Sequence, residues 1–242
     1  MASAFVFPGG AADPGEDART AAARELFEEA GVLLARDAGR GGETLEVPTQ
    51  AGLRKRILEG ANAAAALEVC GLEWSTDMLV PWSHWITPSI EPKRFSARFF
   101  LCELPSGQVP SFDDIETVDE VWIRPADAIA RAGELALPPP QVRTCWELAE
   151  LPTIEAVLAA GRARAEEPHP IMPRLSQGGG SQGGGGGAPC LLLPWDPEYV
   201  NGATGDSAPL TYRPRWARGP SRFVMEDRAW KHVDAPGSTS AG

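Results

Sequence analysis

Residues 10–32, GAADPGEDARTAAARELFEEAGV, contain the pattern that decides the fold. We predict a helix over about residues 17–30, because acidic residues stand near its start while small apolar residues and Leu26 can face a core. Gly31 follows at the position where helices commonly end in left-handed backbone. Glu25, Glu28 and Glu29 are spaced i, i+3 and i+4, so their carboxylates project from one face of this helix.

This carboxylate spacing indicates a metal site. Like charges this close oppose a helix by a few tenths of a kcal/mol per pair, and a hard divalent cation removes the conflict. Carboxylate oxygens suit Mg²⁺ or Mn²⁺, and Mg²⁺ usually keeps positions for water and substrate phosphate. Gly9 and Gly10 bring backbone near the helix, so a carbonyl could complete the shell. The alternative is a charged, solvated helix face.

The flanking sequence predicts strands that alternate with helices. Residues 4–7 predict a short strand that stops at Pro8-Gly9-Gly10, residues 32–34 predict a second strand, and residues 36–48 predict a loop. Further strands are expected at 79–87, 95–104 and 118–123, and helices at 51–69, from Pro125, at 141–151 and at 153–166. The alternation indicates an α/β or α+β layered domain over residues 1–166.

The composition changes after Glu167, and residues 167–242 are expected to form a C-terminal extension that ends in a flexible tail. Residues 177–188 are rich in glycine, which is typical of a flexible linker. The flanks at 170–175 and 190–194 nevertheless both predict strands. A β-hairpin with a long loop is favoured, since lengthening a surface loop costs only ~0.6 kcal/mol per doubling.

Composition excludes several classes of protein. The 242 residues carry a formal charge of −11, which argues against a nucleic-acid binder that relies on a basic stripe. No apolar run approaches the ~18 residues of a membrane helix, and the N-terminus lacks the features of a signal peptide, so we expect a cytoplasmic protein that does not bind membranes. The four cysteines are far apart, which argues against a paired-cysteine zinc site. No feature assigns an oligomeric state.

The helical pattern also matches a known motif. The spacing Gly10-x5-Glu16-x7-Arg24-Glu25-Leu26-x-Glu28-Glu29-x-Gly31-Val32 agrees with the nudix box at every defined position. Its seven fixed letters would arise by chance on the order of 10⁻⁸ per window. The chain thus resembles nudix hydrolases. The resemblance implies a nudix-type α/β/α sandwich, here without the strand that normally precedes residues 4–7, and hydrolysis of a nucleoside diphosphate linked to another moiety.

The resemblance also implies roles for the residues of the box. Three glutamates would bind Mg²⁺ or Mn²⁺, with a backbone carbonyl nearby: Glu25, Glu28, Glu29 and the carbonyl of Gly9. Arg24 would hold the glutamates by charge-assisted hydrogen bonds. Glu16 would support the loop-to-helix geometry or an outer metal shell. The metal would neutralise the diphosphate and lower the pKa of a water that attacks phosphorus.

A later acidic segment offers a general base. Many members of the family use an acidic residue from such a loop as base or as an additional ligand. Residues 109–120 contain five acidic residues and no basic one, and Glu116 and Glu120 are the candidates. A base must lie within hydrogen-bond reach of the attacking water. Ordinary solvated acidic residues are the alternative interpretation.

Motifs outside the box resemble one subgroup. Residues 81–88, 94–101, 137–141, 170–171 and 192–199 look like the mammalian peroxisomal acyl-coenzyme A diphosphatase subgroup and its bacterial relatives. This resemblance implies cleavage of coenzyme A or acyl-coenzyme A into 3′,5′-ADP and a 4′-phosphopantetheine. The final residues, 240–242, do not form a peroxisomal address of the Ser-Lys-Leu type, which favours the cytoplasm.

The substrate of this subgroup carries an additional 3′-phosphate and an adenine. Arg94 and Arg98 are the preferred phosphate contacts among the basic residues, which also include Arg54, because a guanidinium grips phosphate in two places. Trp82 and Trp85 could stack on adenine, or they could belong to the core, as large aromatic residues on a strand often do.

Two other functions remain open. Pro48 is a faint indication of an ADP-ribose or nucleoside-diphosphate-sugar hydrolase. A protein of another class, a catalytically weakened nudix module that binds a nucleotide as a sensor, is also compatible with the motif. The intact glutamates argue against the sensor.

Overall fold

A computed structural model describes residues 4–39, 47–88, 91–111, 120–166, 169–176, 188–204, 209 and 213–236. It contains two compact units. The box unit comprises residues 7–80 and 100–122, and the sheet unit comprises residues 1–6, 81–99 and 123–242. The predicted division at residue 166 remains a proposal.

Helix α1, Ala18–Ala30, begins and ends where the sequence predicts. Asp17 caps its N-terminus, because one carboxylate oxygen accepts hydrogen bonds from the backbone N–H of Arg19 at 2.8 Å and of Thr20 at 3.2 Å. Gly31 ends the helix in left-handed backbone with a φ of 66°, and its N–H donates to the carbonyl of Phe27. Both ends therefore have partners for backbone groups that a helix leaves unpaired.

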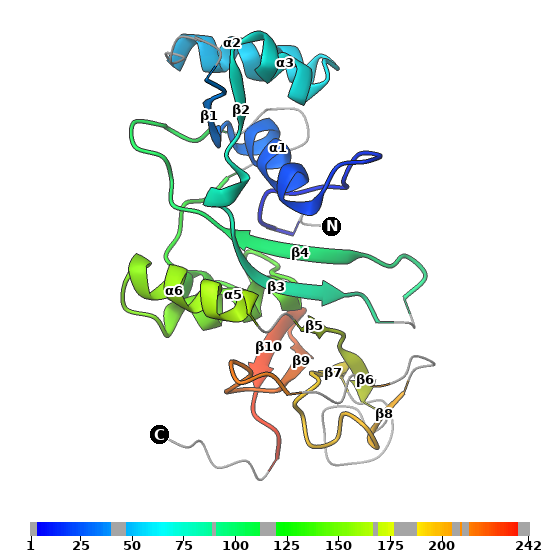
Figure 1. Cartoon of the computed structure of the whole chain (residues 1–242). Coiled ribbons are helices and arrows are strands. Elements are labelled where there is room, and N and C mark those ends of the chain that lie inside the picture. Colours follow the sequence, from blue (N-terminus) through cyan, green and yellow to red (C-terminus); the bar gives the residue numbers. More distant parts are fainter. Residues whose placement is uncertain are drawn as a thin grey trace. The chain divides into compact units, whose positions relative to one another are not determined.

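Two further helices follow in the box unit, α2 at Val47–Leu58 and α3 at Ala63–Val69. The prediction of one helix over residues 51–69 was wrong. The chain breaks after α2, where Gly60 adopts a φ of 98° and Asn62 accepts a hydrogen bond from the N–H of Ala65 to cap α3. Figure 1 shows the two helices as separate rods in cyan.

A small antiparallel sheet joins β1, Ala35–Asp37, to β2, Leu72–Trp74, and the 3₁₀-helix η1, Thr76–Met78, follows. The strand predicted at residues 32–34 was therefore placed too early. Those residues are buried, but Leu33 pairs with a side chain: its N–H donates to Oε1 of Gln108 at 2.7 Å, and its carbonyl accepts from Nε2 at 2.9 Å. The Gln108 amide thus takes the place of a neighbouring strand.

Apolar side chains from all three α-helices form the core of the box unit. The main cluster consists of Phe27, Leu33, Leu53, Ile57, Ala63, Ala66 and Leu67. A second cluster places Ala23 of α1 against Val32, Leu34 and Leu79. One side of α1 is thereby buried, and carboxylates on another side of the helix contact the preceding loop.

In the sheet unit, a three-stranded sheet has the order β4-β3-β5, with β3 at Val80–Ile86, β4 at Ser96–Leu101 and β5 at Pro170–Ile171. The predicted strands at 79–87 and 95–104 are confirmed. Residues 4–7 are not a strand, although Phe5 packs on the core of this unit and its N–H donates to Leu135 O at 3.0 Å.

The strand predicted at residues 118–123 was wrong for its described part. Residues 120–123 have no regular structure, and residues 118 and 119 lie outside the described ranges. Trp122 is 68% exposed, whereas Ile123 packs against the core of the sheet unit without pairing to a strand.

The expected helices of the sheet unit are present as α4, Pro125–Ala130, α5, Pro139–Ala149, and α6, Ile154–Ala165. A five-stranded sheet with the order β10-β9-β7-β6-β8 follows, formed by β6 at Arg174–Ser176, β7 at Cys190–Leu192, β8 at Ala203–Thr204, β9 at Arg222–Glu226 and β10 at Ala229–Val233. Strands β6 and β7 pair antiparallel, which confirms the hairpin; the loop at residues 177–187 lies outside the described ranges. The mixed α/β fold class is confirmed.

Buried charges join α5 to the C-terminal part of the sheet unit. Arg143 donates to Glu147 at 2.7 Å and to the carbonyls of Arg218 at 2.8 Å and Pro220 at 3.0 Å. Arg164 donates to the second oxygen of Glu147 at 2.6 Å. The two guanidinium groups and the carboxylate are therefore paired, as buried charges require.

Beside this network, the His232 ring stacks on Phe223 with 4.6 Å between the ring centroids. Burial and the positive charge of Arg143 lower the pKa of His232 from 6.5 to about 3.

Across the described ranges, none of the helices combines the length and the apolar character needed to cross a membrane.

We predict that His232 makes the protein less stable in acid. Between pH 6.5 and about 3 the unfolded chain binds a proton at His232 that the folded chain does not bind. As the pH is lowered through this range, this residue should therefore reduce the free energy of unfolding by up to about 1.4 kcal/mol per pH unit. His232→Phe should remove this contribution, as measured by urea unfolding from pH 7 to 4. Parallel pH curves for the two proteins would contradict the prediction.

Candidate functional site

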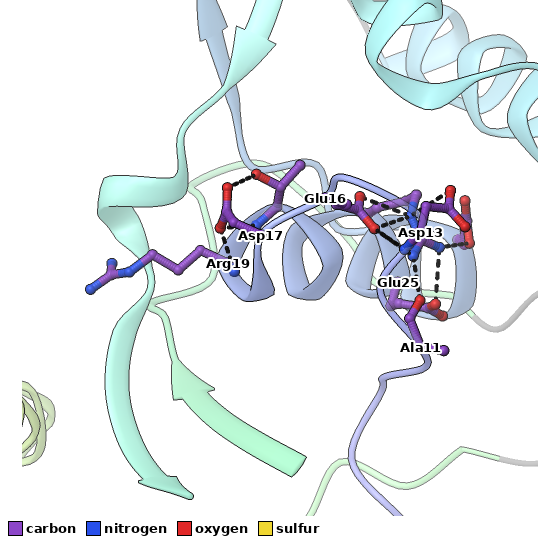
Figure 2. Close-up of polar contacts among 9 residues, drawn as sticks. Ala11, Asp13, Glu16, Asp17, Arg19 and Glu25 are labelled. Atoms are coloured by element: carbon purple, nitrogen blue, oxygen red, sulfur yellow. Dashed lines mark hydrogen bonds and ion pairs between the residues drawn. The ribbon is translucent and has the colours of Figure 1, made fainter. Parts of the chain in front are cut away.

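Arg24 of α1 lies at the centre of a cluster of carboxylates. Its side chain is only 10% exposed. Nε and Nη2 donate to Glu16 at 3.1 and 3.0 Å, and Nη1 donates to Glu25 at 2.9 Å and to Glu28 at 3.0 Å. Nη2 also donates to the carbonyl of Ala11 at 2.9 Å. Figure 2 shows Ala11, Asp13, Glu16 and Glu25 gathered on one side of the view, with the cap at Asp17 on the other side.

The loop before α1 is attached to the helix by polar contacts. Glu16 accepts a hydrogen bond from the N–H of Asp13 at 3.0 Å in addition to those from Arg24. The N–H of Gly9 donates to Glu29 at 3.1 Å. At Gly10 an added Cβ would collide with the Glu25 carboxylate, so the loop and this carboxylate can lie this close because residue 10 has no side chain.

The pKa directions reflect an excess of negative charge. Burial raises the pKa of Glu28, and the charge of Glu25 adds to this effect, although Arg24 opposes it. For Glu16 burial alone would raise the pKa, but hydrogen bonds from Arg24 and from the backbone of Asp13 lower it overall. At Glu16 the Arg24 guanidinium helps to outweigh the effect of burial on the carboxylate, whereas at Glu28 it offsets this effect only in part.

The cluster has the chemistry of a site for a hard divalent cation. Its donors are carboxylate oxygens, Glu28 is incompletely neutralised, and Gly10 leaves the space that Glu25 occupies. Among the residues that the structure describes, no three acidic, histidine or cysteine side chains converge closely enough to hold a metal ion. Arg24 instead engages one oxygen each of Glu25 and Glu28. The residues fit a cation by composition, and their ligand roles remain predictions.

The structure brings together most of the residues predicted from the box. Glu16, Arg24, Glu25 and Glu28 share one hydrogen-bonded network, and Gly9 forms a pair with Glu29 beside it.

The two candidate bases are placed differently. Glu120 belongs to the box unit, where it is exposed and has no regular backbone. Glu116 lies outside the described ranges, so its predicted role stays a prediction.

The residues predicted to contact the substrate belong to the sheet unit. Arg94 is exposed, and its Nε donates to the carbonyl of Thr87 at 3.2 Å. Arg98 is exposed on β4; burial and then the charge of Arg98 lower the pKa of His84. Both arginines are accessible to a phosphate.

The two tryptophans are buried. Trp82 is 2% and Trp85 is 4% exposed, and the guanidinium of Arg164 covers the Trp82 ring at 3.7 Å from its centroid. A base stacks on an accessible ring face, so this burial favours the core interpretation. Stacking on adenine stays a prediction for both residues.

Arg54 of α2 is a site residue whose place the sequence did not indicate. It donates to the carbonyl of Glu28 at 3.0 Å from Nε and at 2.8 Å from Nη2, and to the carbonyl of Glu29 at 2.9 Å. Its Nη1 donates to Oγ of Ser111 at 3.0 Å. Arg54 is separated from these carbonyls by about 25 residues in the sequence. No local pattern could therefore reveal the contact.

Comparison with known proteins identifies the class. Residues 14–150 match the family model described as the NUDT19 Nudix domain. This match covers more than half of the chain, and the chain therefore belongs to the nudix hydrolase family. It is a hydrolase.

Two curated relatives and one solved structure are similar to the chain. It is 33% identical over 158 residues to nudix hydrolase 7 of Caenorhabditis elegans, covering 62% of this chain and 52% of the relative. It is 35% identical over 152 residues to the acyl-coenzyme A diphosphatase NUDT19 of Homo sapiens, covering 56% and 40%. The chain thus spans about half or less of these relatives.

A nudix hydrolase crystal structure from Alicyclobacillus acidocaldarius has a TM-score of 0.55 and 29% identity to the chain. The similarity covers 64% of this chain and 79% of that one. It supports the nudix fold of the described structure.

We predict that Arg24→Gln destabilises the protein by about 3 kcal/mol, because removal of one partner leaves buried carboxylates unpaired. Arg36→Gln is the control, since Arg36 pairs with Glu73 and Asp77 at an exposed position, and it should change stability little. Urea unfolding at neutral pH measures both. Equal effects of the two substitutions would show that the cluster does not depend on Arg24.

Proposed function

We propose that this nudix hydrolase cleaves the diphosphate of coenzyme A or an acyl-coenzyme A with Mg²⁺ or Mn²⁺, giving 3′,5′-ADP and a 4′-phosphopantetheine. The Arg24-centred cluster of glutamates on α1 is the observation that carries the proposal. The choice of substrate rests on the similarity to the human protein named acyl-coenzyme A diphosphatase, of which the chain covers 40%. An ADP-ribose hydrolase and a nucleotide sensor are the alternatives that experiment must separate.

In this proposal Glu25, Glu28 and Glu29 would hold the cation, with the Gly9 carbonyl as a further ligand. When bound, the cation would neutralise diphosphate charge and lower the pKa of a water nucleophile. Arg24 orients Glu25 and Glu28 by binding one oxygen of each. Glu16, which binds Arg24 from the loop, fixes the guanidinium in turn. Such partners of the ligands typically change metal affinity by 10–100-fold.

Proton transfer and substrate binding would use other residues. Glu116 or Glu120 would accept the proton of the attacking water, provided that a carboxylate reaches it. The exposed guanidinium groups of Arg94 and Arg98 would bind phosphate, the 3′-phosphate of coenzyme A included.

The test offers coenzyme A, acyl-coenzyme A and ADP-ribose to the purified protein with Mg²⁺ or Mn²⁺, and identifies the products by mass. We expect 3′,5′-ADP from the coenzyme A substrates. Preferential cleavage of ADP-ribose would favour the first alternative, and nucleotide binding without cleavage of any substrate would favour the sensor.

The same assay tests the metal assignment. Glu28→Gln should lower kcat at least about 100-fold. Loss of a residue that hydrogen-bonds to a metal ligand typically lowers affinity or activity 10–100-fold, and loss of a ligand should lower activity more. Glu59→Gln makes the same chemical change at an exposed residue after α2 and should have no effect. Full activity of the Glu28 variant would show that the cation does not depend on this carboxylate.

We predict that Gly10→Ala separates stability from metal binding. The added methyl group meets the end of the Glu25 side chain, which must turn away and give up its hydrogen bond from Arg24; the fold should tolerate this one lost contact better than the loss of Arg24 itself. The Glu25 carboxylate should then leave the ligand position, and Mn²⁺ affinity should fall about tenfold, as measured by electron paramagnetic resonance of free Mn²⁺. Gly52→Ala, where an added Cβ meets nothing within 4 Å, is the control. Unchanged Mn²⁺ affinity in the Gly10 variant would count against Glu25 as a ligand.

A further inference from the structure

The C-terminal end of α1 has a partner for each of its last four carbonyls, which helix geometry leaves unpaired. Gly31 N–H donates to Phe27 O, Arg54 donates to Glu28 O and Glu29 O, and Ser111 N–H donates to Ala30 O. Only the Gly31 contact comes from the adjoining backbone. The other partners come from α2 and from the segment before residue 112, so tertiary structure closes this end of the helix.

Arg54 holds the two central carbonyls of this set. Its three hydrogen bonds to Glu28 O and Glu29 O span 2.8–3.0 Å, and these are the backbones of two proposed metal ligands. A cation at a helix C-terminus also interacts favourably with the helix dipole. The contact is thus to the backbone that carries the two carboxylates.

Gly31 gives independent evidence that the guanidinium is closely fitted. A Cβ at this position would lie 3.0 Å from Nη1 of Arg54 and 3.2 Å from Oγ of Ser111. The glycine of the box therefore provides left-handed backbone and also leaves space for Arg54.

Arg54 also contacts Ser111, whose segment is hydrogen-bonded to the backbone of residues 30–33. Ser111 accepts from Nη1 at 3.0 Å, while its own N–H binds Ala30 O. Three residues earlier, Gln108 makes two hydrogen bonds to the backbone of Leu33. The guanidinium therefore joins α2 to the end of α1 and to a segment that is itself fixed beside residues 30–33.

We propose that Arg54 is a positioning residue for the metal site. By fixing the last turn of α1 it sets the direction in which the Glu28 and Glu29 side chains leave the helix. The inference rests on the proposed function, in which these glutamates bind the cation. Arginine is specifically suited, because a planar guanidinium reaches two carbonyls and a hydroxyl at once, whereas the ammonium of lysine is a single point charge.

The experiment measures Mn²⁺ affinity of the full chain by electron paramagnetic resonance, without substrate. Arg54→Lys keeps the charge but loses the planar fork, and it should weaken Mn²⁺ binding about tenfold. Arg36→Lys makes the same change at an exposed residue of β1 and should leave the affinity unchanged. Thermal unfolding of the metal-free proteins is recorded in parallel, so that affinities are compared at a temperature where each is folded.

A purely structural role would lower the unfolding temperature of Arg54→Lys but leave the Mn²⁺ affinity of the folded protein unchanged, and this result would overturn the inference. Ser111→Ala provides a second variant, which removes the hydroxyl contact and keeps Arg54; a smaller loss of affinity in the same direction is expected. If wild-type protein binds Mn²⁺ and Glu28→Gln does not, while both Arg54→Lys and Ser111→Ala bind normally, the inference fails and the proposed function stands. If the wild-type protein binds no Mn²⁺, the proposed metal dependence fails as well.

Discussion

The structure of the box unit depends on the buried guanidinium of Arg24. Its donors reach Glu16 and the carbonyl of Ala11 in the loop, and Glu25 and Glu28 on the helix. A guanidinium presents several N–H groups in a fixed plane, so one side chain sets the distance between loop and helix as well as the charge balance. Without it, carboxylates on adjacent turns would repel one another in a partly buried setting, where that repulsion is poorly screened.

The same interaction prepares the site for a cation without completing it. Arg24 contributes one positive charge to a cluster that contains Glu16, Glu25, Glu28 and the nearby Glu29. The pKa directions of Glu16 and Glu28 are opposite, because hydrogen bonds from Arg24 and Asp13 outweigh burial at Glu16, whereas burial and the charge of Glu25 outweigh Arg24 at Glu28. A divalent cation would favour ionised Glu28 and would thus supply the compensation that Arg24 alone does not give.

Local signals predicted α1, whereas one error came from local signals that were overlooked and another from a contact distant in sequence. Asp17 and Gly31 act on neighbouring backbone, so the sequence shows both ends of the helix. The break between α2 and α3 was missed because apolar spacing continues across Gly60 and Asn62, although these two residues end one helix and start the next. Residues 32–34 were placed in a strand because they are apolar, but a strand needs a partner, and Leu33 has Gln108.

The two ends of α1 differ in a way that connects fold to chemistry. The N-terminal end is closed by Asp17, which is adjacent in sequence and would cap the helix even in a loosely folded chain. The glutamates lie toward the other end, where Arg54 and Ser111 come from distant segments. Helix termini fray unless their backbone groups find partners, so the packing of α2 helps to order the turn that carries Glu28 and Glu29. In the proposed function, the chemistry of the box therefore depends on a helix that contributes no residue to the box.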